Sequence, residues 1–440
     1  MPTSGTDRNT PEILLGLFQS PLSTIPKLLQ TAVMDTFNGV IATWFKTMQP
    51  GQLFSISPVS SLMALGLVLL TFGGLFFILY RILRVQDIVT PSSNFPWYRS
   101  GMILGAVALV LGFAPGWSTG QSITVTNSMY NDRFGLAAMA GAALVVTALV
   151  DWIIQNQKYQ IAIYCLLIGL AVGFQFRNAV NYRWSWEKQL RTYWELKWRA
   201  PQIDAPTTFF GESTLFGYMG GGANAAAFKQ MYSFQLDSPN VRYGYNDLYK
   251  IDPDDYLIGG ALYKPTNDQN LVIQSYPESG ECVWVLSMAD FHNPYLSTTV
   301  KSILPISNLN IIHEDTSKLP ASIFGAEPAP FWCYYYEKAG LAAQFGKWDQ
   351  VINLWKEAQS QDFAPSIETE YIPFVEAAAM TGDWQLARDL GKKANHPSFQ
   401  MNDYLCTVWK RVFQNAPASD GKTFTQEWVK GEFSCSNFIQ

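Results

Sequence analysis

Apolar residues are concentrated before Phe176, where four stretches of the chain carry no charged side chain. A helix rises about 1.5 Å per residue and the hydrocarbon core of a bilayer is about 30 Å thick, so a span needs about 20 mainly apolar residues. We therefore predict four transmembrane helices, over Ser61–Tyr80, Gly101–Trp117, Phe134–Ile154 and Tyr159–Phe176. The third is rich in Gly and Ala, which favours close helix packing in lipid.

A fifth apolar element precedes these four, over Leu28–Phe45, and contains Asp35 and Asn38. It either crosses the membrane or lies in the interface as an amphipathic helix, and the two alternatives are equally open. Lys and Arg near span ends favour the cytoplasmic side, but basic residues follow the predicted spans on both sides. The pattern therefore leaves the side of the membrane open.

An aromatic and basic helix is predicted over 178–200, because Tyr182, Trp186, Leu190, Trp194 and Trp198 recur every fourth residue. Trp and Tyr are enriched at bilayer interfaces, where a ring and a polar N–H or O–H are both accommodated. We expect this helix to anchor a soluble domain at the lipid surface. The expected lipid-interface residues are Trp184, Trp186, Arg191, Trp194 and Trp198.

Short β-rich runs follow the boundary at Pro201–Pro206 and predict a small α+β domain over 201–320. Two of these runs, 271–276 and 282–286, flank a Pro- and Gly-containing segment that suits a hairpin loop. After the Pro- and Ala-rich segment Pro320–Pro330, the pattern becomes helical.

The helical tail contains an internal repeat of two helical hairpins, 332–360 and 369–394, followed by a capping helix over Asp403–Phe413. Trp348 and Trp384 occupy equivalent turns 36 residues apart, close to the tetratricopeptide period of about 34. Together with Tyr335 they belong either to the core or to a partner-binding face.

The expected fold is thus an α-helical membrane domain with four spans, or five if the N-terminal element crosses, followed by a small α+β domain and a tetratricopeptide-like tail. The domains are 1–58 (N-terminal amphipathic element or extra span), 59–177 (transmembrane domain), 178–200 (interfacial helix), 201–320 (α+β domain) and 321–440 (helical repeats).

Charge and cysteine content narrow the functional classes. A net charge of −5 argues against nucleic-acid binding, which usually needs a basic surface. The five cysteines have no metal-site spacing and suit small buried residues, with a Cys333–Cys406 or Cys406–Cys435 disulfide as alternatives. Neither a metal nor a cofactor is expected.

The best candidate for chemistry is Asp132 with Arg133, at the mouth of the third span. An ionisable pair is costly if it enters lipid, unless it is paired or functional. Helix capping with an interfacial ion pair is the alternative interpretation.

Scattered motifs between Ile103 and Phe413 resemble a family of uncharacterised multi-pass membrane proteins of green non-sulfur bacteria. They are the segment 331–339 followed by Gly346-Lys347-Trp348, the segment 132–134, and the segment 172–179 continuing to 198–201. Longer members resemble membrane-embedded C-class glycosyltransferases with an extracytoplasmic C-terminal domain. The resemblance implies that placement here, although this chain lacks the family's additional N-terminal spans and an acidic first-loop site.

Two functions follow as expectations. A recognisable interaction module without a catalytic constellation favours a non-enzymatic scaffold or accessory subunit of a bacterial membrane assembly, in contact with lipid and with protein partners. The alternative is a transferase, intact or degenerate, that uses a polyprenyl-phosphate sugar and relies on Asp132.

Overall fold

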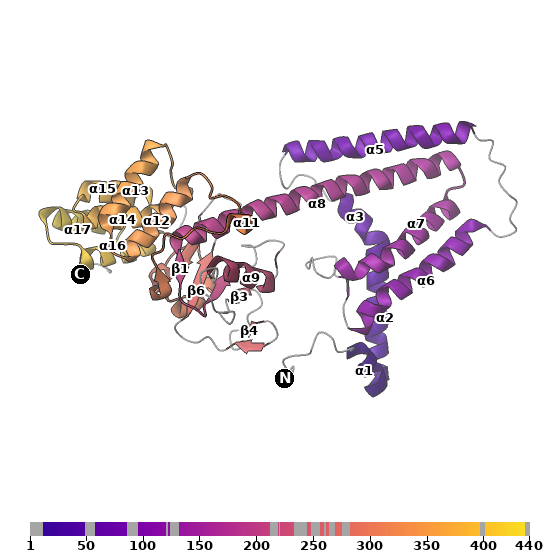
Figure 1. Cartoon of the computed structure of the whole chain (residues 1–440), viewed down its shortest axis with the longest axis horizontal. Helices are drawn as coiled ribbons and strands as arrows, with labels where there is room; N and C mark the ends of the chain where they lie inside the picture. Colours follow the sequence, from indigo (N-terminus) through magenta and orange to yellow (C-terminus); the bar gives the residue numbers. More distant parts are fainter. Residues whose placement is uncertain are drawn as a thin grey trace. The chain divides into compact units, whose positions relative to one another are not determined.

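The computed structural model of the chain forms two compact units (Figure 1). Unit one extends to Trp184, and unit two begins at Ser185. The structure describes residues 12–48, 58–85, 96–119, 122–123, 132–211, 219, 221–232, 244–247, 256–258, 261–263, 269–274, 282–396 and 401–435.

Unit one is helical throughout its described residues. Its elements are α1 (Glu12–Gln19), α2 (Pro21–Phe37), the π-helix η1 (Asn38–Ala42), α3 (Thr43–Met48), α5 (Pro58–Val85), α6 (Trp97–Ser118), the 3₁₀ helix η2 (Asp132–Ala138), α7 (Met139–Ile153) and α8 (Gln157–Arg199). Four helices, α5 to α8, are long and apolar enough to cross a bilayer, as predicted. Helix α8 continues well beyond its apolar stretch, which ends at Phe176, and its residues from Ser185 belong to unit two.

Helices α6 and α7 pack closely through glycines. A Cβ atom added at Gly112 would lie 2.6 Å from backbone atoms of Ala138, and one added at Gly141 would lie 2.5 Å from the Leu109 nitrogen. Side chains larger than hydrogen are therefore excluded at these contacts, as the Gly- and Ala-rich pattern predicts. Gly101 approaches Ala148, so the two helices run antiparallel.

Unit two begins with a four-stranded sheet in the order β3-β2-β6-β7. The strands are β2 (Thr208–Gly211), β3 (Gly244–Asp247), β6 (Asn270–Gln274) and β7 (Trp284–Leu286). Strand β2 pairs in parallel with β3 and β6, with Phe209 opposite Leu271, whereas β6 and β7 form the predicted antiparallel hairpin. Every residue of β2 and β6 is buried, as expected for parallel strands covered on both faces.

Smaller elements complete this part of unit two. Two short antiparallel pairs join β1 (Gln202–Ile203) to β8 (Ile312–His313) and β4 (Tyr256–Ile258) to β5 (Ala261–Tyr263). The helical elements are α9 (Gly221–Tyr232), η5 (Met288–Asp290), α10 (Thr298–Ile303), η6 (Leu304–Ile306), η7 (Leu309–Ile311) and α11 (Ala321–Phe324). The mixed content confirms helices and strands in 201–320.

The tail of unit two is a succession of antiparallel helices around one apolar core. They are α12 (Trp332–Gln344), α13 (Trp348–Ser360), η8 (Glu368–Tyr371), α14 (Ile372–Met380), α15 (Trp384–Lys393), α16 (Met401–Asn415) and α17 (Asp420–Glu432). The turns of the first two hairpins contain Gly346 and Gly382 at φ +68° and +84°, a region that favours glycine. A third pair, α16 and α17, stands where one capping helix was expected. The assignment to the tetratricopeptide class stays a prediction.

Candidate functional site

The C-terminal part of α8 lies inside unit two rather than at a lipid surface. The indoles of Trp194 and Trp198 are 3% and 4% exposed. Trp194 donates to the carbonyl oxygen of Phe324 at 3.0 Å, and Trp198 donates to a carboxylate oxygen of Glu327 at 3.1 Å. The predicted lipid contact of these two residues is therefore wrong, because the segment after β8 covers their face of the helix.

The other three predicted interface residues differ from these two. Trp184 and Trp186 are about half exposed, and their contact with lipid stays a prediction. Arg191 is directed into unit two, where its Nε donates to Glu195 at 2.5 Å and its guanidinium lies over the Phe331 ring. It therefore serves an internal ion pair.

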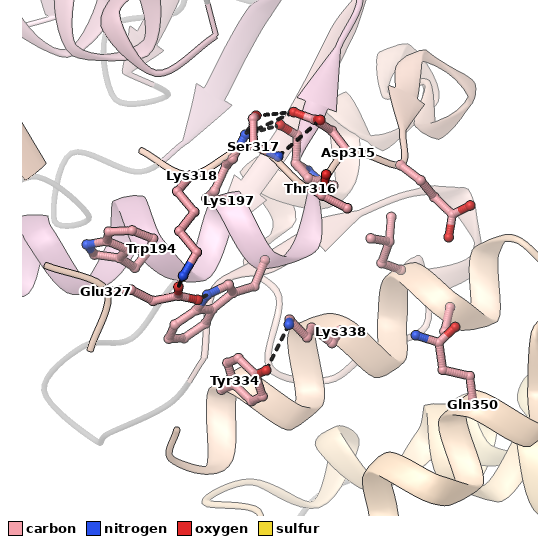
Figure 2. Close-up of a pocket in the computed structure, with 15 residues that line it drawn as sticks. Trp194, Lys197, Asp315, Thr316, Ser317, Lys318, Glu327, Tyr334, Lys338 and Gln350 are labelled. Atoms are coloured by element: carbon pink, nitrogen blue, oxygen red, sulfur yellow. Dashed lines mark hydrogen bonds and ion pairs between the residues drawn. The ribbon is translucent and has the colours of Figure 1, made fainter. Parts of the chain in front are cut away.

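A cleft of about 770 Å³ opens beside the buried end of α8 (Figure 2). Its walls come from three parts of unit two: the end of α8, the segment 314–318 with Glu327, and the first tail hairpin, α12 and α13. Trp198 and Tyr334 pack edge to face in its wall, with ring centroids 5.1 Å apart. The cleft thus combines an aromatic wall with charged side chains.

One end of the cleft is closed by internal hydrogen bonds. The buried Lys197 ammonium donates to the Pro201 carbonyl oxygen at 2.6 Å and to the Ser317 hydroxyl at 2.9 Å. It also forms an ion pair with Asp315 at 3.5 Å. Because an ammonium has three donors, these contacts account for all of them. Lys197 therefore holds the segment 314–318 onto α8.

The other end of the cleft keeps binding capacity. Lys318, 76% exposed, pairs with Glu327 at 2.9 Å. Lys338 donates to the Tyr334 hydroxyl at 2.8 Å and lies 4.2 Å from the centroid of that ring. Figure 2 shows the Lys338 ammonium directed toward Tyr334 at the foot of the cleft. The Lys338 ammonium has three N–H donors, and among the described residues one neutral acceptor, the Tyr334 hydroxyl, is found for them. Donors therefore remain for an anionic group.

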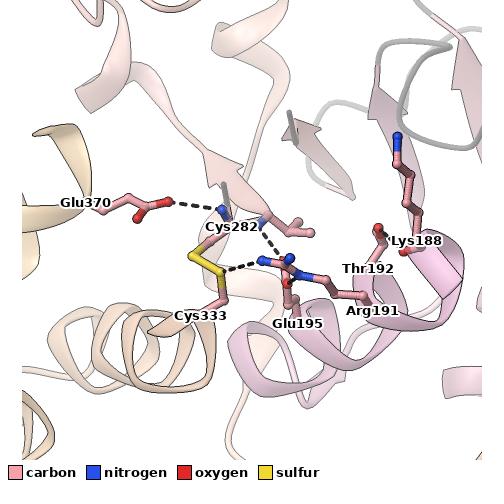
Figure 3. A network of polar contacts seen from close by, with 8 residues as sticks. Lys188, Arg191, Thr192, Glu195, Cys282, Cys333 and Glu370 are labelled. Carbon is pink, nitrogen blue, oxygen red and sulfur yellow. Dashed lines mark hydrogen bonds and ion pairs between the residues drawn. A yellow bond between two sulfur atoms is a disulfide. The ribbon is translucent and has the colours of Figure 1, made fainter. Parts of the chain in front are cut away.

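A buried carboxyl cluster lies on another face of α8 and α12 (Figure 3). Glu195 accepts from the Val283 N–H at 2.9 Å and from Arg191. Glu370 accepts from the Cys282 N–H at 3.0 Å and from the Trp332 indole at 2.6 Å. The two carboxylates thus join α8 and the start of η8 to the backbone that leads into β7.

Glu337 is the least compensated member of this cluster. It is 1% exposed, and no hydrogen bond of ordinary geometry reaches either of its carboxylate oxygens from the described residues. Burial raises the pKa of Glu337 well above its usual range, and the neighbouring Glu195 raises it further while Arg199 opposes the shift. Burial likewise raises the pKa of Glu195 to about 7. The protonated forms of these acids are therefore favoured in the fold.

Two disulfides lie in unit two. The favoured interpretation as simple buried apolar residues is therefore wrong for four of the five cysteines. Cys406–Cys435 confirms one of the two alternatives, and the other is wrong because Cys333 is bonded to Cys282. The Arg191 guanidinium donates to the Cys333 sulfur at 3.2 Å, so the disulfide adjoins the carboxyl cluster. Cys165 is free and buried, as a small apolar residue would be.

The predicted interaction residues of the tail are largely buried in its core. Tyr335 and Trp384 are 2% and 6% exposed, and Trp348 packs partly buried against the same core. Burial corrects the partner-face interpretation for Tyr335 and Trp384, whose surfaces are used inside the tail. Asp132 and Arg133 begin η2, but their side chains lie outside the described part of the structure.

Among the described residues, no group of three His, Cys, Asp or Glu side chains is placed to hold a metal ion. The cleft is lined by three lysines and three carboxylates beside its aromatic wall. The chain matches no known protein-family model, no curated protein and no solved structure.

Proposed function

We propose that the chain is a membrane-anchored accessory subunit, or scaffold, of a larger assembly in a bacterial cell membrane. Unit two binds a segment of a partner protein. The observation that carries this proposal is the cleft, because it is open to solvent and is framed by a helical hairpin on one side and the buried end of α8 on the other. The four apolar helices of unit one support the role of anchor.

The partner is expected on the extracytoplasmic side. Disulfides persist mainly in oxidising compartments, and both disulfides of the chain lie in unit two. Charge does not decide the placement, because basic residues near span ends lie on both sides: Arg81, Arg84, Arg99 and Lys158 on one side, and Arg133, Arg177 and Arg183 on the other.

The chemistry of the cleft selects an acidic segment. Lys318 and Lys338 flank Glu327, so this end of the cleft carries one positive charge more than negative. A carboxylate of the partner gains charge-assisted hydrogen bonds from the Lys338 ammonium, and apolar atoms beside it contact the Tyr334 ring. Loss of one buried charged contact at an interface typically costs about 2–5 kcal/mol of binding free energy. Reversing the charge of Lys338 is therefore expected to weaken the binding of the partner strongly.

The test is purification of the full-length chain from native membranes in a gentle detergent, with mass spectrometry of what accompanies it. Wild type and Lys410→Glu, an exposed lysine in α16, are expected to carry the same stoichiometric partner. Lys338→Glu is expected to lose it at least tenfold. A solitary monomer, or a partner kept by Lys338→Glu, would overturn the proposal. A solitary protein carrying polyprenyl-phosphate lipid would favour the transferase expectation instead.

A further inference from the structure

The helical segment Pro21–Met48, made of α2, η1 and α3, forms one rod in unit one (Figure 1) and exposes a long apolar stripe. The stripe recurs every third or fourth residue and so occupies one helix face. Its members are Leu22, Ile25, Leu29, Val33, Phe37, Ile41 and Phe45, each between 43% and 91% exposed. At about 1.5 Å per residue, the stripe is about 35 Å long, which is too large to leave in water.

The opposite face of the rod is polar at its centre and is bound to the rest of unit one. Asp35 is 2% exposed and accepts hydrogen bonds from the Trp117 indole at 2.8 Å and from the Ile123 N–H at 3.0 Å. Gly39 approaches Phe113, since a Cβ added there would lie 3.2 Å from that ring. The rod is therefore fixed to the C-terminal end of α6.

A second contact fixes the far end of the rod. Arg177, the first charged residue after the apolar stretch of α8, donates to the Thr47 carbonyl oxygen at 3.0 Å. Helices α6 and α7 run antiparallel, and so do α7 and α8, because Tyr164 near the start of α8 bonds Asp151 near the end of α7. Helices α6 and α8 therefore cross in the same direction, and Trp117 and Arg177 reach the same membrane face.

These two anchors set the direction of the rod. Asp35 and Thr47 are 12 residues apart, which is about 18 Å along a helix. A rod crossing the bilayer would separate them by about 18 Å in depth, more than half of the hydrocarbon thickness of about 30 Å. Both are instead held at one face, by residues at the ends of two spans, so the rod runs along that face.

We propose that Pro21–Met48 lies in the bilayer interface on the face where α8 leaves the membrane, with its apolar stripe inserted among lipid acyl chains. Of the two alternatives for the N-terminal element, the rod therefore takes the interfacial one. This inference goes beyond the accessory role, and it does not depend on the cleft or on a partner. It also places Ser20 and Met48 at the membrane face where α8 leaves the bilayer.

Single-cysteine labelling tests the placement of the rod. In a Cys165→Ala background the four other cysteines are paired, so one added cysteine reports alone. Ser20→Cys and Met48→Cys, at exposed positions, are expected to react in intact cells with a membrane-impermeant maleimide, as does the unit-two control Glu357→Cys. The control Gln157→Cys, at the start of α8, is expected to react only after permeabilisation.

The outcomes separate this inference from the proposed function. Opposite labelling of Ser20→Cys and Met48→Cys means that the rod crosses, which overturns the inference. Labelling of Ser20→Cys, Met48→Cys and Glu357→Cys only after permeabilisation leaves the rod interfacial and overturns the extracytoplasmic placement instead.

Insertion is measured with a spin label in vesicles of phosphatidylethanolamine and phosphatidylglycerol. A label at Phe37→Cys is expected to collide preferentially with oxygen at a shallow depth of about 5–10 Å, and one at Gln30→Cys, off the stripe, with a water-soluble nickel complex. A label at Phe37 that collides with neither shows that protein covers the stripe. That result overturns the lipid assignment.

Discussion

The buried carboxyl cluster predicts that unit two loses stability as pH rises from 5 to 8. Glu195, Glu337 and Glu370 all have a pKa raised in the fold, and burial is the largest cause for each. A group whose pKa is higher in the folded chain binds its proton more tightly there. Its stabilising contribution is complete below the unfolded pKa and disappears as pH rises through the folded pKa.

Glu195 gives a magnitude for this effect. Its pKa changes from 4.5 in the unfolded chain to about 7 in the fold. One pKa unit corresponds to about 1.36 kcal/mol, so integration between pH 5 and pH 8 gives a loss of about 2.5 kcal/mol from this group alone. The other two acids change the free energy of unfolding in the same direction. For a unit of this size, about 2.5 kcal/mol lowers the melting temperature by about 5–10 °C.

The assay is urea unfolding of the full-length chain in mild detergent, followed by tryptophan fluorescence at several pH values. Glu337→Gln keeps the side-chain shape and removes the least compensated carboxyl, so its stability is expected to exceed that of wild type at pH 8 and to approach it at pH 5. Glu432→Gln, at an exposed position of α17, is the matched control and keeps the wild-type profile. A wild-type stability that is constant or rises from pH 5 to 8 would refute the reasoning.

Two further perturbations test the packing of the tail. Replacing Cys406 and Cys435 together by alanine opens a loop with a sequence separation of 29 and is expected to cost about 3.5 kcal/mol, measured as a lower urea midpoint under non-reducing conditions. Gly391→Ala would place a Cβ 2.9 Å from the fully buried Trp409 ring and is expected to cost about 1–3 kcal/mol. Gly431→Ala meets nothing within 4 Å and should not destabilise the chain; an equal loss in both variants would contradict the packing argument.

The hydrophobic periodicity of the sequence predicted those helices whose local pattern matches the environment in which they are found. The four spans are long and apolar, and the two tail hairpins combine a helical period with Gly346 and Gly382, whose turns need positive φ. The parallel pairing of β2 with β3 and β6 was not predictable in the same way. These strands are four or five residues long and are joined by long segments, so their partners depend on tertiary packing.

The candidate site was largely hidden in the sequence. Lys197 lies more than a hundred residues before the other charged residues of the cleft, which fall between Glu314 and Lys338. Spacing along the chain does not show which distant segments meet. Glu337 could have been noticed in the sequence, because it directly follows the aromatic run Trp332–Tyr336. A carboxyl that is buried with such a run costs free energy unless it is compensated. The aromatic stripe of Trp194 and Trp198 was misassigned because the same pattern suits a lipid interface and a protein core equally well.

Two helices have one face in the cleft and the other in the carboxyl cluster. On α8, Trp194 and Trp198 line the cleft, whereas Glu195 points to the cluster. On α12, Lys338 lines the cleft, whereas Glu337 is buried in the cluster. Adjacent residues on a helix point about 100° apart, so neighbouring positions can serve two different environments. The hydrogen bonds of the cluster fix the rotation of α8 relative to the strands, and the Cys282–Cys333 disulfide does the same for α12. The cleft is therefore preorganised by buried groups that do not line it, which would lower the conformational cost of the binding proposed there.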